Sequence, residues 1–270
     1  MKAGSSKKGV YVSTIKSGQP SYRASITYKS KHISLGSYSS SLQAEKAYKY
    51  AKRILDSDSY SLSRWRKNSP LPFEKCVILS NFKDHGIYFA TPIYLEKKYF
   101  NYYLSPAVVL TFDTEDLFYY SLHKIMKRGS HLFVADYGSQ VNVLSRYGIK
   151  SFSVPGRDYL FINGNSNDLR YENIEVLNRY NGVRQYNDKG FVKYKAVIHV
   201  IGDYIIGKYE SENEAAIAYN KAADILAKNG FTKNFVQNYI EELGNMQYAE
   251  IYTNVAISPK LYKLKPLEGK

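Results

Sequence analysis

The sequence predicts an α+β protein in which two small sheet-plus-helix domains flank a third domain of a different kind. One pattern of glycines, tyrosines and alanines occurs near both ends of the 270-residue chain. In each copy, apolar residues alternate as they do in strands and then recur at helical spacing. Between the copies, short apolar runs separated by polar residues are typical of a β-rich domain.

The two copies of the repeat keep a nearly constant offset. Gly36 corresponds to Gly207 at an offset of 207 − 36 = 171 residues. Gly9 corresponds to Gly182 at an offset of 182 − 9 = 173 residues. We therefore expect the first hairpin alone to absorb a length difference of two residues.

Each copy predicts three short antiparallel strands followed by one helix that packs across the back of the sheet. In the second strand of the first copy, Ala24 and Ile26 alternate with polar residues, so one side faces the core and the other faces solvent. Ser40 and Ser211 then open S-x-x-Q/E capping boxes, which satisfy backbone N–H groups at a helix start. Alanines at helical spacing follow, and their small size lets each helix lie close to its sheet.

The sheet face opposite the helix is left uncovered, and in both copies polar and basic side chains alternate with the inward ones. The turns between the strands add further lysines. A two- or three-stranded sheet fits the major groove of DNA, where such side chains reach phosphates and base edges. We expect two DNA-binding faces, formed by Tyr11, Ser13, Lys16, Arg23, Ser25, Thr27, Lys29, Lys31 and His32 in the first copy and by Arg184, Tyr186, Lys189, Lys193, Lys195, Val197 and His199 in the second.

The charge distribution indicates a polyanionic partner. The chain has a net charge of +14, and residues 1–56 hold eleven Lys or Arg against two acids, which gives 11 − 2 = +9. Such a local excess favours nucleic acid, because binding releases condensed counterions. The alternative is a solvated basic face that only maintains solubility.

The repeat resembles the plant ethylene-response-factor (Apetala-type) DNA-binding domain. The pattern G-V…(Y/W)-x-A-x-I…(L/I)-G-x-Y…E-A-A-x-A-Y…A-A carries the resemblance over roughly residues 8–56 and 180–239. In that family the three strands enter the major groove and the helix supports them, so the resemblance implies double-stranded DNA as the partner. Tyr22 and Tyr194 stand where the family usually has tryptophan.

A short region near the end of the middle domain resembles the core of an HNH homing endonuclease, whose motif reads roughly D-H-I-(N/D)-G-N-x-x-D-N-R-x-x-N-L. Residues 113–116 resemble the acidic run that begins such domains, and residues 143–146 resemble their L-H-R strand. The resemblance implies a ββα-type domain, and HNH nucleases of phages and mobile elements often carry an Apetala-type domain at the C-terminus. The matching residues are Ile162, Asn163, Gly164, Asn165, Asp168, Arg170 and Asn173, with Ile174 in place of the motif's leucine.

The residues that would perform this family's chemistry are replaced. Leu160 stands at the metal-binding Asp, Phe161 at the general-base His, Ser145 at the His of L-H-R, and Leu169 at the second Asn of D-N-R, whereas Asn173 is retained. Phosphodiester hydrolysis of this kind needs a base to activate water and a cation beside the scissile phosphate. We therefore expect a degenerate nuclease domain with no catalytic residues, no metal and no cofactor.

Two further residues, Trp65 and Cys76, are expected to pack inside the protein. Trp65, between two arginines, could stack on a nucleic acid, but packing against a neighbouring side chain is favoured. The single Cys76 excludes an intramolecular disulfide and is expected to be buried as a small hydrophobe. The expected organisation is a first DNA-binding domain at 1–57, a linker at 58–72, the nuclease-like domain at 73–178, a second DNA-binding domain at 179–243 and a tail at 244–270.

Together these features predict a sequence-specific double-stranded DNA-binding protein and not an enzyme. We expect it to regulate transcription, as a repressor. We expect a bipartite site with its two blocks about one to two helical turns apart. A monomer is favoured, and a regulatory protein or peptide partner is left open.

The chain lacks long apolar runs and an apolar signal segment, so we expect a cytoplasmic, nucleoid-associated protein of bacterial or phage type with no membrane partner. Two alternatives remain: an active HNH nicking or homing endonuclease with an atypical site, and a module that binds RNA or an acidic protein.

Overall fold

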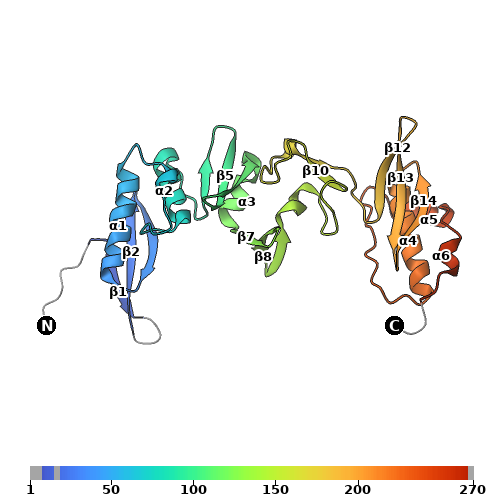
Figure 1. Cartoon of the computed structure of the whole chain (residues 1–270), viewed down its shortest axis with the longest axis horizontal. Coiled ribbons are helices and arrows are strands. Elements are labelled where there is room, and N and C mark those ends of the chain that lie inside the picture. Colours follow the sequence, from blue (N-terminus) through green and yellow to red (C-terminus); the bar gives the residue numbers. More distant parts are fainter. Residues whose placement is uncertain (1–7, 15–18, 267–270) are drawn as a thin grey trace. The chain divides into compact units, whose positions relative to one another are not determined.

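The computed structural model describes residues 8–14 and 19–266, and its elements are labelled in Figure 1. It is an α+β structure with several small three-stranded antiparallel sheets. The chain divides into two compact units, one made of Met1–Val143 with Asn165–Tyr171 and the other of Leu144–Gly164 with Glu172–Lys270. Each unit holds one copy of the repeat.

The first copy forms the three strands and the helix that its pattern predicts. The strands β1 (Val10–Thr14), β2 (Pro20–Tyr28) and β3 (Lys31–Tyr38) make an antiparallel sheet in that order. The helix α1 (Ser41–Asp56) covers one face of it, as Figure 1 shows. Alanines at positions 44, 47 and 51 are fully buried, so the helix lies close to the sheet.

The second copy repeats this arrangement. The strands β12 (Val183–Asp188), β13 (Phe191–His199) and β14 (Asp203–Tyr209) precede the helix α4 (Glu212–Lys228). The serine half of each predicted capping box is confirmed: the Ser40 hydroxyl accepts a hydrogen bond from the Gln43 backbone amide, and the Ser211 hydroxyl accepts one from the Asn213 backbone amide. We call these two sheet-plus-helix units the first and the second module.

The repeat extends to irregular details of the backbone. The register between the second and third strands shifts between Ala24 and Ser25 in the first module and at the equivalent place, between Ala196 and Val197, in the second. Each bulge adds one unpaired residue, which bends the strand and increases its twist. The shared glycine at position 36 pairs with Ala24, so it lies beside the bulge.

The length difference between the copies is shared by the two hairpins. Equivalent paired residues on the first and second strands are 14 positions apart in the first module (Val10 and Ala24) and 13 positions apart in the second (Val183 and Ala196). From the second strand to the third they are 12 and 11 positions apart. The expectation that the first hairpin alone absorbs two residues is therefore wrong. The pairs are Val10–Ala24 and Ala24–Gly36 in the first module, and Val183–Ala196 and Ala196–Gly207 in the second.

The segment expected as a linker and the residues after it pack against the first module. A short 3₁₀ helix, η1 (Leu62–Arg64), is followed by α2 (Phe73–His85), which lies against α1. The Trp65 indole donates a hydrogen bond to the Leu71 carbonyl at 2.9 Å and packs edge-on against the Phe73 ring, so the packing interpretation of this tryptophan is confirmed.

Cys76 lies on α2 and is fully buried, as predicted. Burial raises the pKa of its thiol to about 12, since the thiolate would lose its solvation. The helix itself was not expected, because the run Cys76–Ser80 is buried on every side and shows no helical periodicity.

The middle of the chain is rich in strands, as its pattern predicts. The strands β4 (Ile93–Leu95), β5 (Tyr99–Ser105) and β6 (Val108–Asp113) form one sheet. A second sheet contains the next three strands of the chain. The other elements here are η2 (Thr114–Asp116), α3 (Leu117–Leu122), β7 (Ile125–Arg128), β8 (His131–Asp136), β9 (Ser139–Asn142), η3 (Val143–Tyr147), β10 (Tyr159–Phe161), η4 (Tyr171–Asn173) and β11 (Ile174–Val176).

Two details differ from the ββα-type expectation. The segment that resembles an L-H-R strand is the 3₁₀ helix η3. The strands β10 and β11 pair as a hairpin, but β12 follows β11 directly. In the described residues, the helix that would complete a ββα unit is therefore missing from this position.

The described part of the expected C-terminal tail belongs to the second module. The helices α5 (Asn245–Asn254) and α6 (Lys260–Lys263) pack against α4, and Leu261 is fully buried there. The side-chain amide of Asn229, at the end of α4, donates hydrogen bonds to the backbone carbonyls of Leu261 and Leu264 at 3.0 and 2.9 Å. Figure 1 shows α5 and α6 beside α4. Each module is thus backed by a second helical layer.

Candidate nucleic-acid interface

The strand register places a polar face on the side of the first sheet away from α1. Tyr11 pairs with Arg23, and Thr27 pairs with His32, in alternation with the inward pair Ile26–Ile33. Tyr11 is 58% exposed. The Thr27 hydroxyl lies 3.4 Å from Nδ1 of His32. On the strands the outward residues are Tyr11, Ser13, Ser21, Arg23, Thr27, His32, Ser34 and Ser37, and we call them the first open face.

Ser25 and Val197 were expected on these faces, but both are buried, with 7% and 6% of their surface exposed. The chain entering the first strand covers them. The Ser25 amide donates to the Gly9 carbonyl at 3.0 Å, and the Val197 amide donates to the Gly182 carbonyl at 2.7 Å. Neither side chain is therefore available to a groove of DNA.

Two predicted lysines lie on the helical side of the first sheet. Lys31 pairs with Tyr28, in the same alternation as the inward pair, and its ammonium lies 5.0 Å from the centre of the Tyr88 ring. The Lys29 ammonium lies 3.5 Å from the Lys83 carbonyl on α2. Their assignment to the open face is therefore corrected. Lys16, the remaining predicted lysine, lies outside the described residues.

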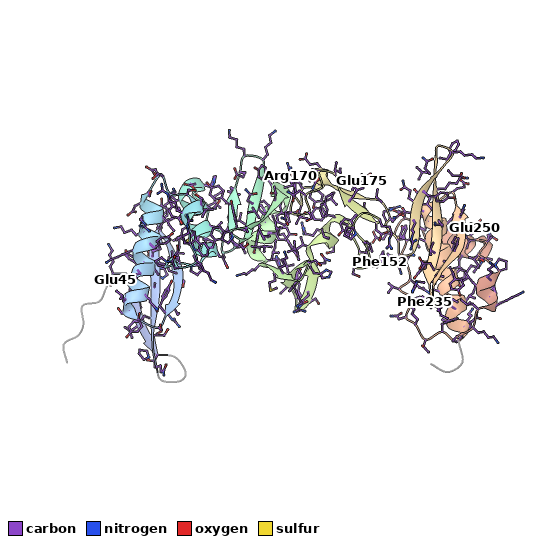
Figure 2. All side chains as sticks on the ribbon, viewed as in Figure 1. Glu45, Phe152, Arg170, Glu175, Phe235 and Glu250 are labelled. Atoms are coloured by element: carbon purple, nitrogen blue, oxygen red, sulfur yellow. The ribbon has the colours of Figure 1, made fainter. Side chains whose placement is uncertain are left out.

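Much of the positive charge of the first module lies on α1. Lys46, Lys49, Lys52 and Arg53 are exposed on this helix, and Lys49 pairs with Glu45, labelled in Figure 2, at 2.8 Å. Of the residues described on the first open face, Arg23 alone carries a permanent positive charge. The first open face is thus rich in hydroxyls, with a single guanidinium among them.

The second module presents more cations on the corresponding face. Arg184, Lys195 and Lys208 pair across the three strands, and Tyr186 pairs with Lys193 next to them. The Lys208 ammonium lies 5.4 Å from the centre of the Tyr186 ring. Lys208 was not predicted, although extending the alternation to the third strand would have found it. These residues, with His199 and Asp203, form the second open face; the predicted Lys189 lies in the turn after β12 with a φ of 53°.

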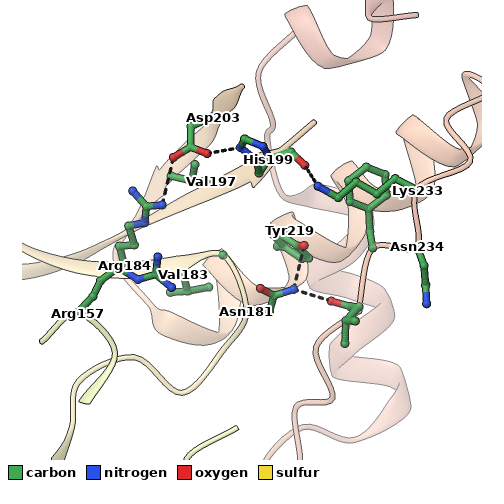
Figure 3. Close-up of a pocket in the computed structure, with 13 residues that line it drawn as sticks. Arg157, Asn181, Val183, Arg184, Val197, His199, Asp203, Tyr219, Lys233 and Asn234 are labelled. Atoms are coloured by element: carbon green, nitrogen blue, oxygen red, sulfur yellow. Dashed lines mark hydrogen bonds and ion pairs between the residues drawn. The ribbon is translucent and has the colours of Figure 1, made fainter. Parts of the chain in front are cut away.

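Acidic side chains neutralise part of the second open face (Figure 3). The Asp203 carboxylate lies 2.8 Å from Nδ1 of His199 and 3.2 Å from a guanidinium nitrogen of Arg184. The hydrogen bond with His199, followed by that with Arg184, lowers the pKa of Asp203. Lys193 pairs in the same way with Asp188 at 3.2 Å and Glu210 at 3.1 Å. In the first module, His32 occupies the position of Asp203.

A hollow lies at the same place in both modules, where the first strand begins beside the helix. In the second module it has a volume of about 480 Å³, and Figure 3 shows Tyr219 and Asn181 on its wall. The Asn181 amide donates to the Tyr219 hydroxyl at 3.0 Å. The hollow of the first module has a volume of about 320 Å³, and among the described residues the buried Ser25 hydroxyl on its wall has no hydrogen-bond partner.

The positions that match the nuclease motif form a structured turn. Leu160 and Phe161 lie on β10, opposite Glu175 and Ile174 of β11; Glu175 is labelled in Figure 2. The buried Asn173 accepts a hydrogen bond from the Asn163 amide at 2.8 Å.

Gly164 supplies the left-handed residue of this turn, with a φ of 74°. Leu169 is buried, and Ser145 lies in η3. The Arg170 guanidinium forms two hydrogen bonds with the Asp168 carboxylate, at 2.9 and 2.7 Å. Within residues 8–14 and 19–266, no three His, Cys, Asp or Glu side chains are grouped so that they could hold a metal ion.

Comparison with models of protein families, with curated proteins and with solved structures finds no match to this chain. The longest described helices, α1 and α4, have 16 and 17 residues, and no helix in the described residues is long and apolar enough to cross a membrane.

Proposed function

We propose that this chain is a sequence-specific double-stranded DNA-binding protein that regulates transcription, as a repressor derived from an inactivated HNH homing endonuclease. One observation carries the proposal: a sheet-plus-helix module occurs twice, and each copy leaves one polar sheet face uncovered by its helix. The resemblance to Apetala-type domains supports the same use of these faces.

The first open face suits base reading more than charge attraction. Its Arg23 is flanked by Tyr11 and Ser37 across the strands. A guanidinium can bond bidentately to O6 and N7 of guanine, and the neighbouring hydroxyls can reach phosphates or other bases. The exposed cations of α1 supply long-range attraction, which acts before contact and does not depend on sequence.

The second open face would bind through Lys195 and Lys208, because Asp203 already engages Arg184 and His199. Two different faces on one chain fit a site with two unlike blocks. Binding of the second block is then intramolecular, so two modest affinities combine into a strong one.

Loss of nuclease activity is part of the proposal. Leu160 and Phe161 are apolar and occupy the motif positions of a metal ligand and a base. Neither side chain can activate water or hold a cation. The purified protein should therefore leave supercoiled plasmid intact with magnesium or manganese.

Selection of binding sites from random DNA duplexes tests the proposal. The wild-type protein should enrich two short blocks, with affinity that falls steeply as salt rises. Arg23→Ala should relax preference at one block only, at a cost of about 1–3 kcal/mol. Lys46→Ala on α1 is the matched control; it removes one charge and should leave the selected sequence unchanged.

Three outcomes would contradict it. Stronger binding to RNA or heparin than to any selected duplex would favour the RNA or acidic-partner alternative. Metal-dependent nicking that is lost in Asn173→Ala would favour an active nuclease. Equal effects of Arg23→Ala and Lys46→Ala on the selected sequence would mean that the first open face does not read bases.

A further inference from the structure

Another hollow, separate from the one beside the first strand, lies on the helical side of the first module. It has a volume of about 400 Å³ and is bordered by the end of α1, by η1 and by the loop that follows. Three arginines line it, Arg53 from α1, Arg64 from η1 and Arg66 from the loop. Tyr60 and Ser69 also line this arginine pocket.

Two of the three guanidinium groups are held in position by the protein. Arg53 lies over the Tyr50 ring, with 4.9 Å between the guanidinium carbon and the ring centre. One terminal nitrogen of Arg66 donates to the carbonyls of Ser63 at 2.6 Å and Trp65 at 2.8 Å. Positioned donors lose little conformational entropy when a ligand arrives, which favours binding.

Two of the side chains that line the pocket carry neutral hydroxyl groups, Tyr60 and Ser69. The Tyr60 hydroxyl lies 3.3 Å from the hydroxyl of the buried Tyr50. Burial, followed by this hydrogen bond, raises the pKa of Tyr60, so its hydroxyl keeps its proton. The Ser69 hydroxyl accepts a hydrogen bond from the Arg66 amide at 3.0 Å, which orders the loop.

The positive charge of the arginine pocket is not neutralised by the protein. None of the lining residues is a carboxylate. Among the described residues, Arg53, Arg64 and Arg66 form no ion pair, whereas Lys49 on the same helix pairs with Glu45. Asp56, near the pocket in sequence, pairs with Lys52 at 4.0 Å. Three exposed cationic side chains therefore line one hollow, and a bound anion would offset their positive charge.

We propose that the arginine pocket binds a phosphate group. Arginine presents planar pairs of N–H donors that match phosphate oxygens, and the hydroxyl of Ser69, which also lines the pocket, can add a hydrogen bond. The pocket lies on the helical side of the sheet and Arg23 on the other side, so this site is separate from the proposed DNA-reading face. The phosphate belongs either to a small phosphorylated molecule or to a nucleic-acid strand, since both offer the same chemistry.

Calorimetric titration of the whole 270-residue chain tests the proposal, with inorganic phosphate, a nucleoside monophosphate and a 5′-phosphorylated oligonucleotide as separate probes. Arg64→Ala is the main variant, because the Arg64 side chain makes no hydrogen bond in the described residues and its loss should not affect folding. We expect Arg64→Ala to weaken binding of at least one probe by about tenfold or more. Arg64→Lys should restore it only in part, because a lysine ammonium lacks the planar fork.

Arg128→Ala is the matched control, because it removes one exposed arginine outside the pocket. A loss confined to the small phosphates, with binding of the selected duplex unchanged, would identify a small phosphorylated ligand. A loss for the oligonucleotide or the duplex would identify a nucleic-acid phosphate. If Arg64→Ala and Arg128→Ala have equal effects on every probe, the arginine pocket is an ordinary solvated surface and the proposal is wrong. The titrations with inorganic phosphate, the nucleoside monophosphate and the oligonucleotide do not depend on whether Arg23 reads bases.

Discussion

At the scale of single residues, the glycine before each module's first strand has a defined steric role. Gly182 has a φ of 74°, and a Cβ atom there would lie 2.3 Å from the Tyr219 ring and 2.5 Å from the Val197 carbonyl. Gly9 has the same conformation and the same kinds of neighbour. Only glycine lets the chain lie this close to the second strand, which is the contact that buries Ser25 and Val197.

Gly182→Ala should therefore destabilise the protein by about 1–3 kcal/mol, through backbone strain and displacement of Tyr219. Urea denaturation followed by circular dichroism measures this. Gly202→Ala is the matched control in the same module, because its φ is ordinary and a Cβ would meet no atom within 4 Å. Equal stability of the two variants would contradict the steric account.

Cys76 provides a second prediction at this scale. With its thiol fully buried and its pKa raised by burial to about 12, it should resist alkylation at pH 8 in the native protein and react fully in denaturant. The ordinary pKa of the thiol is 9.0, so the native state disfavours the thiolate. The thiol's contribution to stability is therefore complete below pH 9 and should decline as the pH rises from about 9 to about 12. Native alkylation at the denatured rate would contradict this.

At the scale of elements, each module depends on helices that its repeat does not contain. The first helix packs against α2, and α4 packs against α5 and α6. Leu261 on α6 is fully buried, whereas its neighbour Tyr262 is 53% exposed. The C-terminal segment is thus part of the folded module.

Leu261→Ala should cost about 2–5 kcal/mol, since it removes buried methyl groups and leaves a cavity. Tyr262→Ala should change the free energy of unfolding by no more than about 0.5 kcal/mol, as exposed positions usually do. Thermal unfolding of both variants measures the difference. If neither substitution lowers the melting temperature, the segment after residue 243 does not stabilise the module.

At the scale of the whole molecule, the proposed function requires both modules to bind one duplex. Inserting about five base pairs between the two selected blocks turns one of them by half a helical turn, so affinity should fall sharply. Inserting about ten base pairs restores the rotation and should recover part of the affinity. Gel-shift titrations of the three duplexes measure this. Equal affinity for all three would show that the modules bind independently or that one of them suffices.

Features that depend on residues close together in the sequence could be predicted. The repeat, its strands and helices, the serine caps, the buried Cys76 and the packed Trp65 could all be predicted, because hydrophobic period and capping chemistry act within a few residues. The helix α2 could not be predicted, because a segment that is buried on every side shows no hydrophobic periodicity.

The open faces were predictable only in part. Alternation correctly put Tyr11, Arg23 and Lys195 outward, but it could not show that a bulge and an incoming chain bury Ser25. The sequence by itself determined that the chain holds two modules of one design around a β-rich middle. The pattern that predicts a module depends on residues close together in the sequence, and it occurs twice. Tertiary structure alone decided that Asp203 neutralises Arg184 and that three arginines from separate segments share one pocket. Both depend on how residues of different elements approach each other in space, which the hydrophobic period of a strand or helix does not indicate.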